Sequence, residues 1–125
     1  MVNKKACFLV LFTSLIITSL FGCGGGANLD ANNGDQTATV TLAWDAPTTN
    51  TDGSSLNPAT DLSQYKIYYG TASLTYATVV NVTNPGTTTI SETLNLSPGT
   101  YYFSVTTVDA SGQESSYSNE VMKTI

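Results

Sequence analysis

The side chains available for chemistry in this chain are few, because the sequence contains neither histidine nor arginine. Nine carboxylates, four lysines and two cysteines supply its ionisable groups besides the tyrosines, and neither cysteine is expected to remain a free thiol, as argued below. Ser-His-Asp and Cys-His arrangements need a base with a near-neutral pKa, and the usual zinc, copper and haem sites use imidazole or thiolate ligands. The composition therefore predicts a protein that is not an enzyme and that has no cofactor and no metal site.

Three carboxylates, Asp45, Asp52 and Asp61, lie in or beside a long polar stretch at residues 48–62. Oxygen ligands of this kind can hold calcium, but their spacing is unlike the regular Asp-x-Asp-x-Asp loop. Turn-forming and solvating aspartates are the favoured interpretation. A carboxylate pair for glycoside hydrolysis stays open in principle, although nothing in the sequence places two carboxylates across a cleft.

The N-terminus has the order of a secretory signal. Lys4 and Lys5 precede an apolar run at residues 6–21, which is short for a membrane-spanning helix of roughly 20 residues. The run ends in Leu20-Phe21-Gly22-Cys23, which resembles the lipobox of bacterial lipoprotein signals, although Phe21 stands where that family usually has a small residue. The expected organisation is a helical signal peptide at residues 1–22.

The lipobox resemblance implies that Cys23 receives diacylglycerol, that the chain is cut before it, and that the new amino group is acylated, for example with palmitate. Two or more acyl chains make a stable membrane anchor. Cys7 would leave with the signal, so the mature chain would have no free thiol and no disulfide. Gly24, rather than Asp, implies export to the outer membrane of the bacterial cell envelope, with the leaflet open.

Cleavage before Cys23 would leave two lysines against nine carboxylates, a net charge of −7. That balance argues against a nucleic-acid partner and against binding to anionic headgroups by charge alone. Residues 23–36 then form the lipidated cysteine and a flexible tether, rich in Gly, Asn and Asp. Thirteen tether residues span roughly 20 Å on average.

The rest of the chain alternates apolar and polar residues, which predicts strands. The clearest segment follows the Pro98-Gly99 turn, where Tyr101, Phe103 and Val105 share one face of the strand. That face should fill an interior, while the alternate side chains on the other face meet solvent. A tyrosine in this place indicates a tyrosine corner. Strands are expected at residues 37–45, 64–70, 76–82, 87–96, 101–108 and 117–125.

These strands carry the marks of a known family. Trp44, Tyr65-x-Ile67-x-Tyr69 and Leu96-x-Pro98-Gly99-Thr100-Tyr101 before Phe103-x-Val105, with the Asp109-Ala110-Ser111-Gly112 turn, resemble a fibronectin type III domain over residues 37–125. The resemblance implies an all-β, immunoglobulin-like antiparallel sandwich. It also implies a structural core of Trp44, Tyr65, Tyr69, Tyr101, Phe103 and Val105.

The family usually has an apolar A strand before the tryptophan strand, but here the tether precedes it. The A strand is therefore expected to be weak or missing: either residues 27–30 pair weakly, or the sheet edge is open. An open edge pairs readily with another chain, including a second copy of this one.

Strand alternation also turns some aromatic residues outward. Tyr68 and Tyr102 are the outward residues, and the type III resemblance implies that their strands are neighbours in one sheet. The two tyrosines should then lie close together, with Lys66 nearby and Tyr76 at the margin, as a candidate ligand-binding set. The alternative is cross-strand aromatic pairing on a solvent face.

Three functions follow as hypotheses. The first is a non-enzymatic cell-envelope lipoprotein, a binding module that presents its type III domain for protein or polysaccharide binding and adhesion. The second is a structural or assembly lipoprotein that pairs through an open sheet edge in an envelope complex or fibre. The third is a small hydrolase or carbohydrate-active enzyme.

Overall fold

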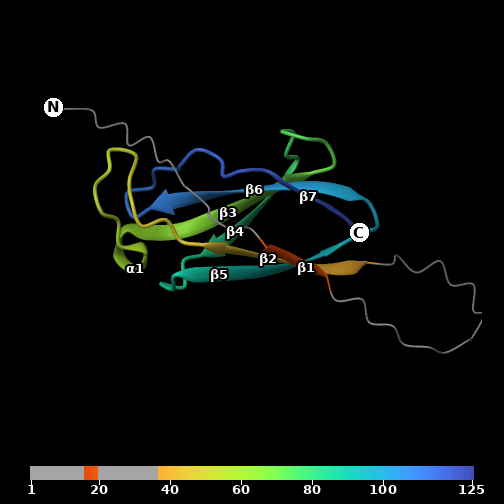
Figure 1. Ribbon diagram of the computed structural model, residues 1–125, viewed down its shortest axis with the longest axis horizontal. Helices are drawn as coiled ribbons and strands as arrows, with labels where there is room; N and C mark the ends of the chain where they lie inside the picture. The colour runs from red at the N-terminus through yellow and green to blue at the C-terminus, as the bar shows by residue number, and fades with distance from the viewer. Residues whose placement is uncertain (1–15, 20–36) are drawn as a thin grey trace, which may run out of the picture.

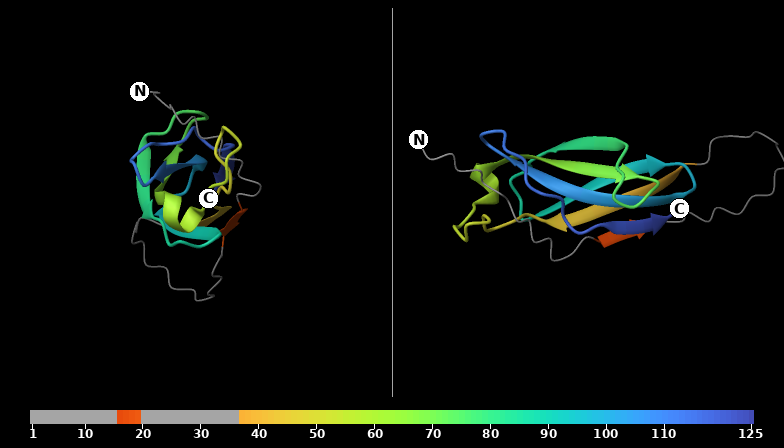
Figure 2. Two further views of the ribbon diagram at one scale, coloured as in Figure 1. Left: turned by 90° about the vertical axis from the view of Figure 1, so that its left-hand side faces the viewer. Right: turned by 90° about the horizontal axis from the view of Figure 1, so that it is seen from above.

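The protein is an all-β sandwich of two antiparallel sheets, as the alternating pattern predicted. The computed structural model describes residues 16–19 and 37–125. One sheet has the order β1-β2-β5 and the other β4-β3-β6-β7 (Figures 1 and 2). The strands are β1 (Ile16–Ser19), β2 (Ala38–Asp45), β3 (Leu62–Gly70), β4 (Thr78–Thr83), β5 (Thr89–Leu96), β6 (Thr100–Asp109) and β7 (Val121–Thr124).

The core lies between the sheets and is filled by the inward rank of each strand. Trp44 meets Tyr65 of the opposite sheet edge-on, with ring centroids 5.6 Å apart. Of the residues expected in the core, Trp44, Tyr65, Phe103 and Val105 are fully buried, whereas Tyr69 and Tyr101 are half-buried and pack against the cluster. The other buried apolar residues are Val40, Leu42, Ala46, Leu56, Leu62, Ile67, Ile90, Leu94, Leu96 and Val108.

The expectation that the outward rank of β6 meets solvent is wrong. Ser104, Thr106 and Val108 are buried, so the strand is covered on both faces. The reason is the chain after the β6 turn, which runs along the β6 edge before β7 begins. Its side chains reach over the outer face: Glu114 accepts a hydrogen bond from Thr106, and the Ser118 hydroxyl lies 3.2 Å from that of Ser104.

The long polar stretch contains one helical turn, α1 (Pro58–Asp61), where only a loop was expected. Asn57 caps it by accepting a hydrogen bond from the Ala59 amide, and proline opens the turn. The turn lies at the end of the sandwich opposite the C-terminus (Figure 1). It leads the chain into β3.

The β2 edge is not open along Val40–Ala43, and residues 27–30, the alternative partner for it, lie outside the described residues. Residues 16–19, expected in a signal helix, form β1 and pair antiparallel with β2 from Ile16↔Ala43 to Ser19↔Val40 (Figure 1). Isoleucine and threonine favour extended backbone, and an edge strand offers unpaired amides and carbonyls. The rest of the predicted signal, Cys23 and the tether at 23–36 lie outside the described residues. No helix in the described part of the chain is long and apolar enough to cross a membrane.

Candidate binding surface

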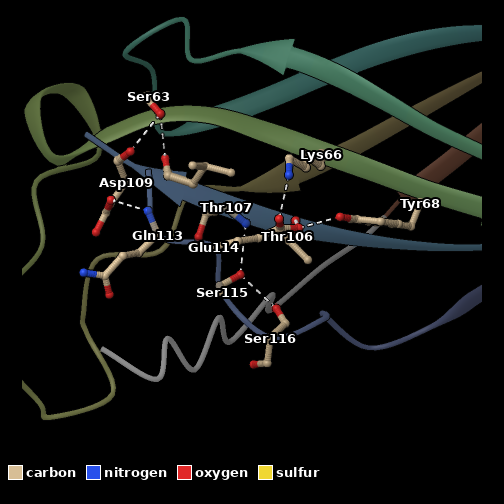
Figure 3. A network of polar contacts seen from close by, with 11 residues as sticks. Ser63, Lys66, Tyr68, Thr106, Thr107, Asp109, Gln113, Glu114, Ser115 and Ser116 are labelled. Atoms are coloured by element: carbon tan, nitrogen blue, oxygen red, sulfur yellow. Dashed lines mark hydrogen bonds and ion pairs between the residues drawn. The ribbon is translucent and has the colours of Figure 1, made fainter. Parts of the chain in front are cut away.

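The outer face of the β4-β3-β6-β7 sheet gathers most of the predicted ligand-binding residues. In the β3–β6 register Lys66 lies opposite Thr106, and Tyr68 lies opposite Ser104. Because β6 is covered along its edge by residues 114–118, the side chains of β3 meet those of that segment. Figure 3 shows Lys66 and Tyr68 pointing from β3 toward Glu114.

Serine hydroxyls fix the covering segment to β6 in place of regular strand pairing. The Ser115 amide donates to the Thr107 carbonyl at 2.9 Å, and the Ser115 hydroxyl accepts from the Thr107 amide at 3.0 Å. Ser118 and Val105 form the same pair of bonds: the Ser118 amide donates to the Val105 carbonyl, and the Val105 amide donates to the Ser118 hydroxyl, each at 2.9 Å. A side chain that replaces a backbone acceptor lets the segment leave the strand path and still satisfies the β6 amides.

Glu114 collects three donors on this face. Its carboxylate accepts from Lys66 Nζ at 2.6 Å, from the Tyr68 hydroxyl at 2.6 Å and from the Thr106 hydroxyl at 2.7 Å (Figure 3). Partial burial acts to raise the pKa of Glu114. The hydrogen bonds from the three donors outweigh it and hold that pKa below its usual range.

Glu120 likewise accepts three hydrogen bonds, all from the loop between β3 and β4. It accepts hydrogen bonds from the Ser73 hydroxyl at 2.6 Å, the Leu74 amide at 2.7 Å and the Tyr76 hydroxyl at 2.7 Å. These bonds hold the pKa of Glu120 below its usual value. The loop is thereby tied to the chain just before β7.

Tyr68, Tyr76 and Tyr117 stack against one another; we call these three residues the tyrosine cluster. The ring centroid of Tyr117 lies 4.9 Å from that of Tyr68 and 5.2 Å from that of Tyr76, with both contacts edge-on. The ring centroids of Tyr68 and Tyr76 are 6.3 Å apart. Burial, aided by hydrogen bonds to Glu114 and Glu120, raises the pKa of both Tyr68 and Tyr76 to about 12. Tyr117 remains 53% exposed.

The structure separates Tyr102 from this cluster. In the register Tyr102 lies between Gly70 and Met122, one outward row beyond Tyr68. Among the described residues it makes no ring contact with the tyrosine cluster. Tyr68 and Tyr102 therefore lie in adjacent outward rows of neighbouring strands and not directly opposite each other, and the rings beside Tyr68 are those of Tyr76 and Tyr117.

Sequence reasoning missed Tyr117, Glu114 and Glu120. Tyr117 was placed at the start of the last strand, and neither glutamate belongs to a recognisable pattern. Both glutamates act across more than forty positions, since Tyr68 and Glu114 are 46 residues apart and Tyr76 and Glu120 are 44 apart. The sequence around these residues carries no regular pattern that would have singled them out.

The aspartates weighed as calcium ligands are used locally. Asp52 accepts from the Ser54 amide and hydroxyl, Asp61 accepts from the Asn57 amide, and Asp45 accepts from Thr89. No group of three or more His, Cys, Asp or Glu able to hold a metal occurs within residues 16–19 and 37–125.

Comparison of the chain with protein-family models and with curated proteins finds no match.

Proposed function

We propose that this protein is a non-enzymatic, lipid-anchored protein of the bacterial cell envelope that presents a fibronectin type III-like module for binding a protein or polysaccharide partner. Cys23 carries the lipid, residues 23–36 form the tether and residues 37–125 form the module. The proposal combines the lipobox resemblance with the fold and the surface described above.

The arrangement of the strands supports a type III-like, immunoglobulin-like module. The sandwich has two antiparallel sheets, with Trp44 and Tyr65 meeting between them. β3 and β6 pair in one sheet, as the resemblance implies. Tyr101 is the second residue of β6, close after the Pro-Gly turn, and its ring lies beside Gly99.

The observation that carries the proposed binding role is the tyrosine cluster. Tyr117 is half-exposed and rests on Tyr68 and Tyr76, whose hydroxyls are held by Glu114 and Glu120. A partner therefore meets aromatic rings that are already ordered, so little rotamer freedom is lost on binding. Tyrosine offers rigid apolar area with a polar tip, and it is enriched at the energetic centres of interfaces.

The test measures binding by the full-length chain, exported, processed and reconstituted in lipid vesicles. The probes are an array of bacterial polysaccharides, including peptidoglycan fragments, and an array of purified envelope proteins. Tyr117→Ala removes the exposed ring of the cluster. Met122→Ala is the matched control, since Met122 is 59% exposed on the same sheet but outside the cluster.

We expect at least one probe to bind the unchanged chain and Met122→Ala, and to lose most of its binding to Tyr117→Ala. Equal binding of that probe to both variants would remove the tyrosine cluster from the proposal. If the unchanged chain bound no probe on either array, the binding role itself would be wrong.

The anchor has a separate test. Cells expressing the chain would be supplied with labelled palmitate, and the chain would be recovered and weighed by mass spectrometry. We expect label in the unchanged chain, none in Cys23→Ser, and loss of residues 1–22 from the labelled form. Label that persists in Cys23→Ser would place the lipid elsewhere.

A further inference from the structure

The outer edge of β2 accepts a short antiparallel strand. Four residues of β1 pair with it in a continuous register, Ile16↔Ala43, Ile17↔Leu42, Thr18↔Thr41 and Ser19↔Val40. The pairing shows that the edge is accessible and long enough for at least four strand residues. It also fixes the direction that a strand on this edge takes.

The strand that occupies this edge belongs to residues 1–22. In the proposed function these residues are cleaved off before Cys23. The inference that follows therefore rests on the proposed anchor. Once β1 is removed, the backbone amides and carbonyls that it satisfied on β2 lose their partner. Unpaired edge groups of this kind favour pairing with another strand.

The β2 edge has none of the features that usually prevent such pairing. Residues 38–44 include no charge, no proline and no glycine, and β2 stays in register with β5 over all eight pairs without a bulge. The other edges differ: β5 carries Glu92 and β7 carries Lys123. β4 is also uncharged, but nothing among the described residues pairs with its outer edge.

We propose that in the processed protein this edge is occupied by β2 of a second copy of the chain. An edge that pairs with itself across a two-fold axis must pair antiparallel, which is the direction that β1 takes on β2. The residues Val40-Thr-Leu-Ala43 also have the same chemistry as Ile16-Ile-Thr-Ser19: uncharged, and with β-branched residues. The product is one continuous sheet with the order β5-β2-β2-β5.

The alternation of β2 limits the possible registers. Val40, Leu42 and Trp44 are buried in the core, whereas Thr39, Thr41 and Ala43 lie on the outer face. Directly opposite residues of an antiparallel pair lie on the same face, so an outer residue of one copy must meet an outer residue of the other. Lipid anchoring of both copies in one surface raises their effective concentration, which favours a small interface.

Cysteine cross-linking tests this pairing on the processed full-length chain in lipid vesicles. The mature chain has no cysteine except the lipidated Cys23, so an introduced thiol is unique. Directly opposite residues in antiparallel strands have Cα atoms about 4.5–5.5 Å apart, which suits a disulfide. Thr39→Cys, Thr41→Cys and Ala43→Cys, alone and coexpressed in pairs, cover the registers centred on the strand.

Two matched controls carry a thiol on outer faces away from this edge. Thr93→Cys lies directly beside Thr41 on β5, and Asn81→Cys lies on the β4 edge of the other sheet. We expect an oxidised dimer, at twice the monomer mass on a non-reducing gel, from at least one β2 variant or pair and from neither control. Excess peptide with the sequence of residues 15–20 should suppress the dimer, because it competes for the same edge.

The outcomes separate this inference from the anchor on which it rests. The mass of the purified chain is measured first, and a chain that retains residues 1–22 overturns both. A processed chain that yields no β2 cross-link overturns the pairing and leaves the anchor intact. Cross-links as abundant at Thr93→Cys or Asn81→Cys as on β2 also overturn it, since they would show contact without use of this edge.

Discussion

A single carboxylate, Glu114, connects three elements of the sandwich. It accepts from Lys66 and Tyr68 on β3 and from Thr106 on β6, although it lies in the segment before β7. Both side chains of the ion pair with Lys66 are partly shielded, with 26% and 31% exposed. Glu114 therefore acts as a structural hub of the candidate surface.

This hub gives a pH-dependent prediction. The pKa of Glu114 is lowered in the folded chain, so its stabilising contribution is present above the unfolded pKa and is lost as pH falls through the folded one. Glu114→Gln should lower the free energy of unfolding by about 1 kcal/mol near neutral pH. The difference from the unchanged chain should shrink as pH falls below about 4. Urea unfolding at several pH values measures it, and a difference that does not shrink at all as pH falls would contradict the charge-based account.

Three buried polar atoms differ from the Glu114 carboxylate in that they have no described hydrogen-bond partner. The Tyr65 hydroxyl, Trp44 Nε1 and Thr107 Oγ1 lie in the interior, and no described residue forms a hydrogen bond with them. Burial raises the pKa of Tyr65 to about 12. An unsatisfied buried hydroxyl costs about 1–3 kcal/mol.

Tyr65→Phe removes the hydroxyl and keeps the ring, so the free energy of unfolding should rise by about 1 kcal/mol. The denaturant midpoint should move upward with no change in the slope. Tyr65→Ala is the control for packing and should cost about 3–5 kcal/mol. Destabilisation by Tyr65→Phe would show that the hydroxyl has a partner, such as a buried water.

At the scale of elements, β6 depends on side chains where a regular strand would use backbone. The amides of Val105 and Thr107 donate to the hydroxyls of Ser118 and Ser115. Ser118→Ala should leave the Val105 amide without an acceptor and cost about 1–2 kcal/mol. Hydrogen exchange at that amide should accelerate more than at neighbouring core amides. Ser91→Ala, on the exposed outer face of β5, should change neither. Unchanged exchange in Ser118→Ala would argue for regular pairing there.

The loop that carries Tyr76 depends on Gly70. A β-carbon at Gly70 would collide with the Thr75 carbonyl oxygen, whereas one at Gly99 would meet the Tyr101 ring at an ordinary 3.5 Å. Gly70→Ala should therefore displace the loop and destabilise the chain by about 1–3 kcal/mol, while Gly99→Ala should be tolerated. Thermal unfolding and the NMR shifts of the Tyr76 ring measure both effects. Equal behaviour of the two variants would contradict the close approach.

Alternation predicted the bounds of β2, β3 and β6 closely. β2, β3 and β6 were expected at 37–45, 64–70 and 101–108, each within two residues of the observed bounds. The last strand was expected from residue 117, but β7 begins at Val121. The reason is physical: Ser115 and Ser118 bond to β6 through hydroxyls, and a period-two pattern does not reveal that exchange.

The candidate surface was only half predictable for a related reason. The outward positions of Lys66 and Tyr68 follow from the inward positions of Tyr65, Ile67 and Tyr69 on the same strand. Glu114 and Tyr117 reach Lys66 and Tyr68 from a segment without regular pattern, far along the sequence. Glu120 reaches Tyr76 from the same segment. Their contacts depend on how that segment crosses the sheet, and local spacing contains no information on that path.

At the scale of the whole molecule, residues 16–19 have two roles that exclude each other. They lie in the apolar run expected of a signal, and they complete the β1-β2-β5 sheet. The inward residues of β2, β3, β5 and β6 form one core. Because β1 pairs with the outer edge of β2, its removal should expose that edge.

The exposed edge should therefore bind a peptide with the sequence of residues 15–20. At low protein concentration, where the processed chain is monomeric, ligand at 100 times its Kd should stabilise the fold by about 2.7 kcal/mol. For a domain of this size each kcal/mol raises Tm by about 4–8 °C, so the shift should exceed about 10 °C. The same peptide carrying Ile17→Pro is the control, since proline has no amide to donate and fits a strand poorly. A thermal shift equal for both peptides would show non-specific apolar binding, and no shift with either would show that β2 does not accept this strand once it is detached.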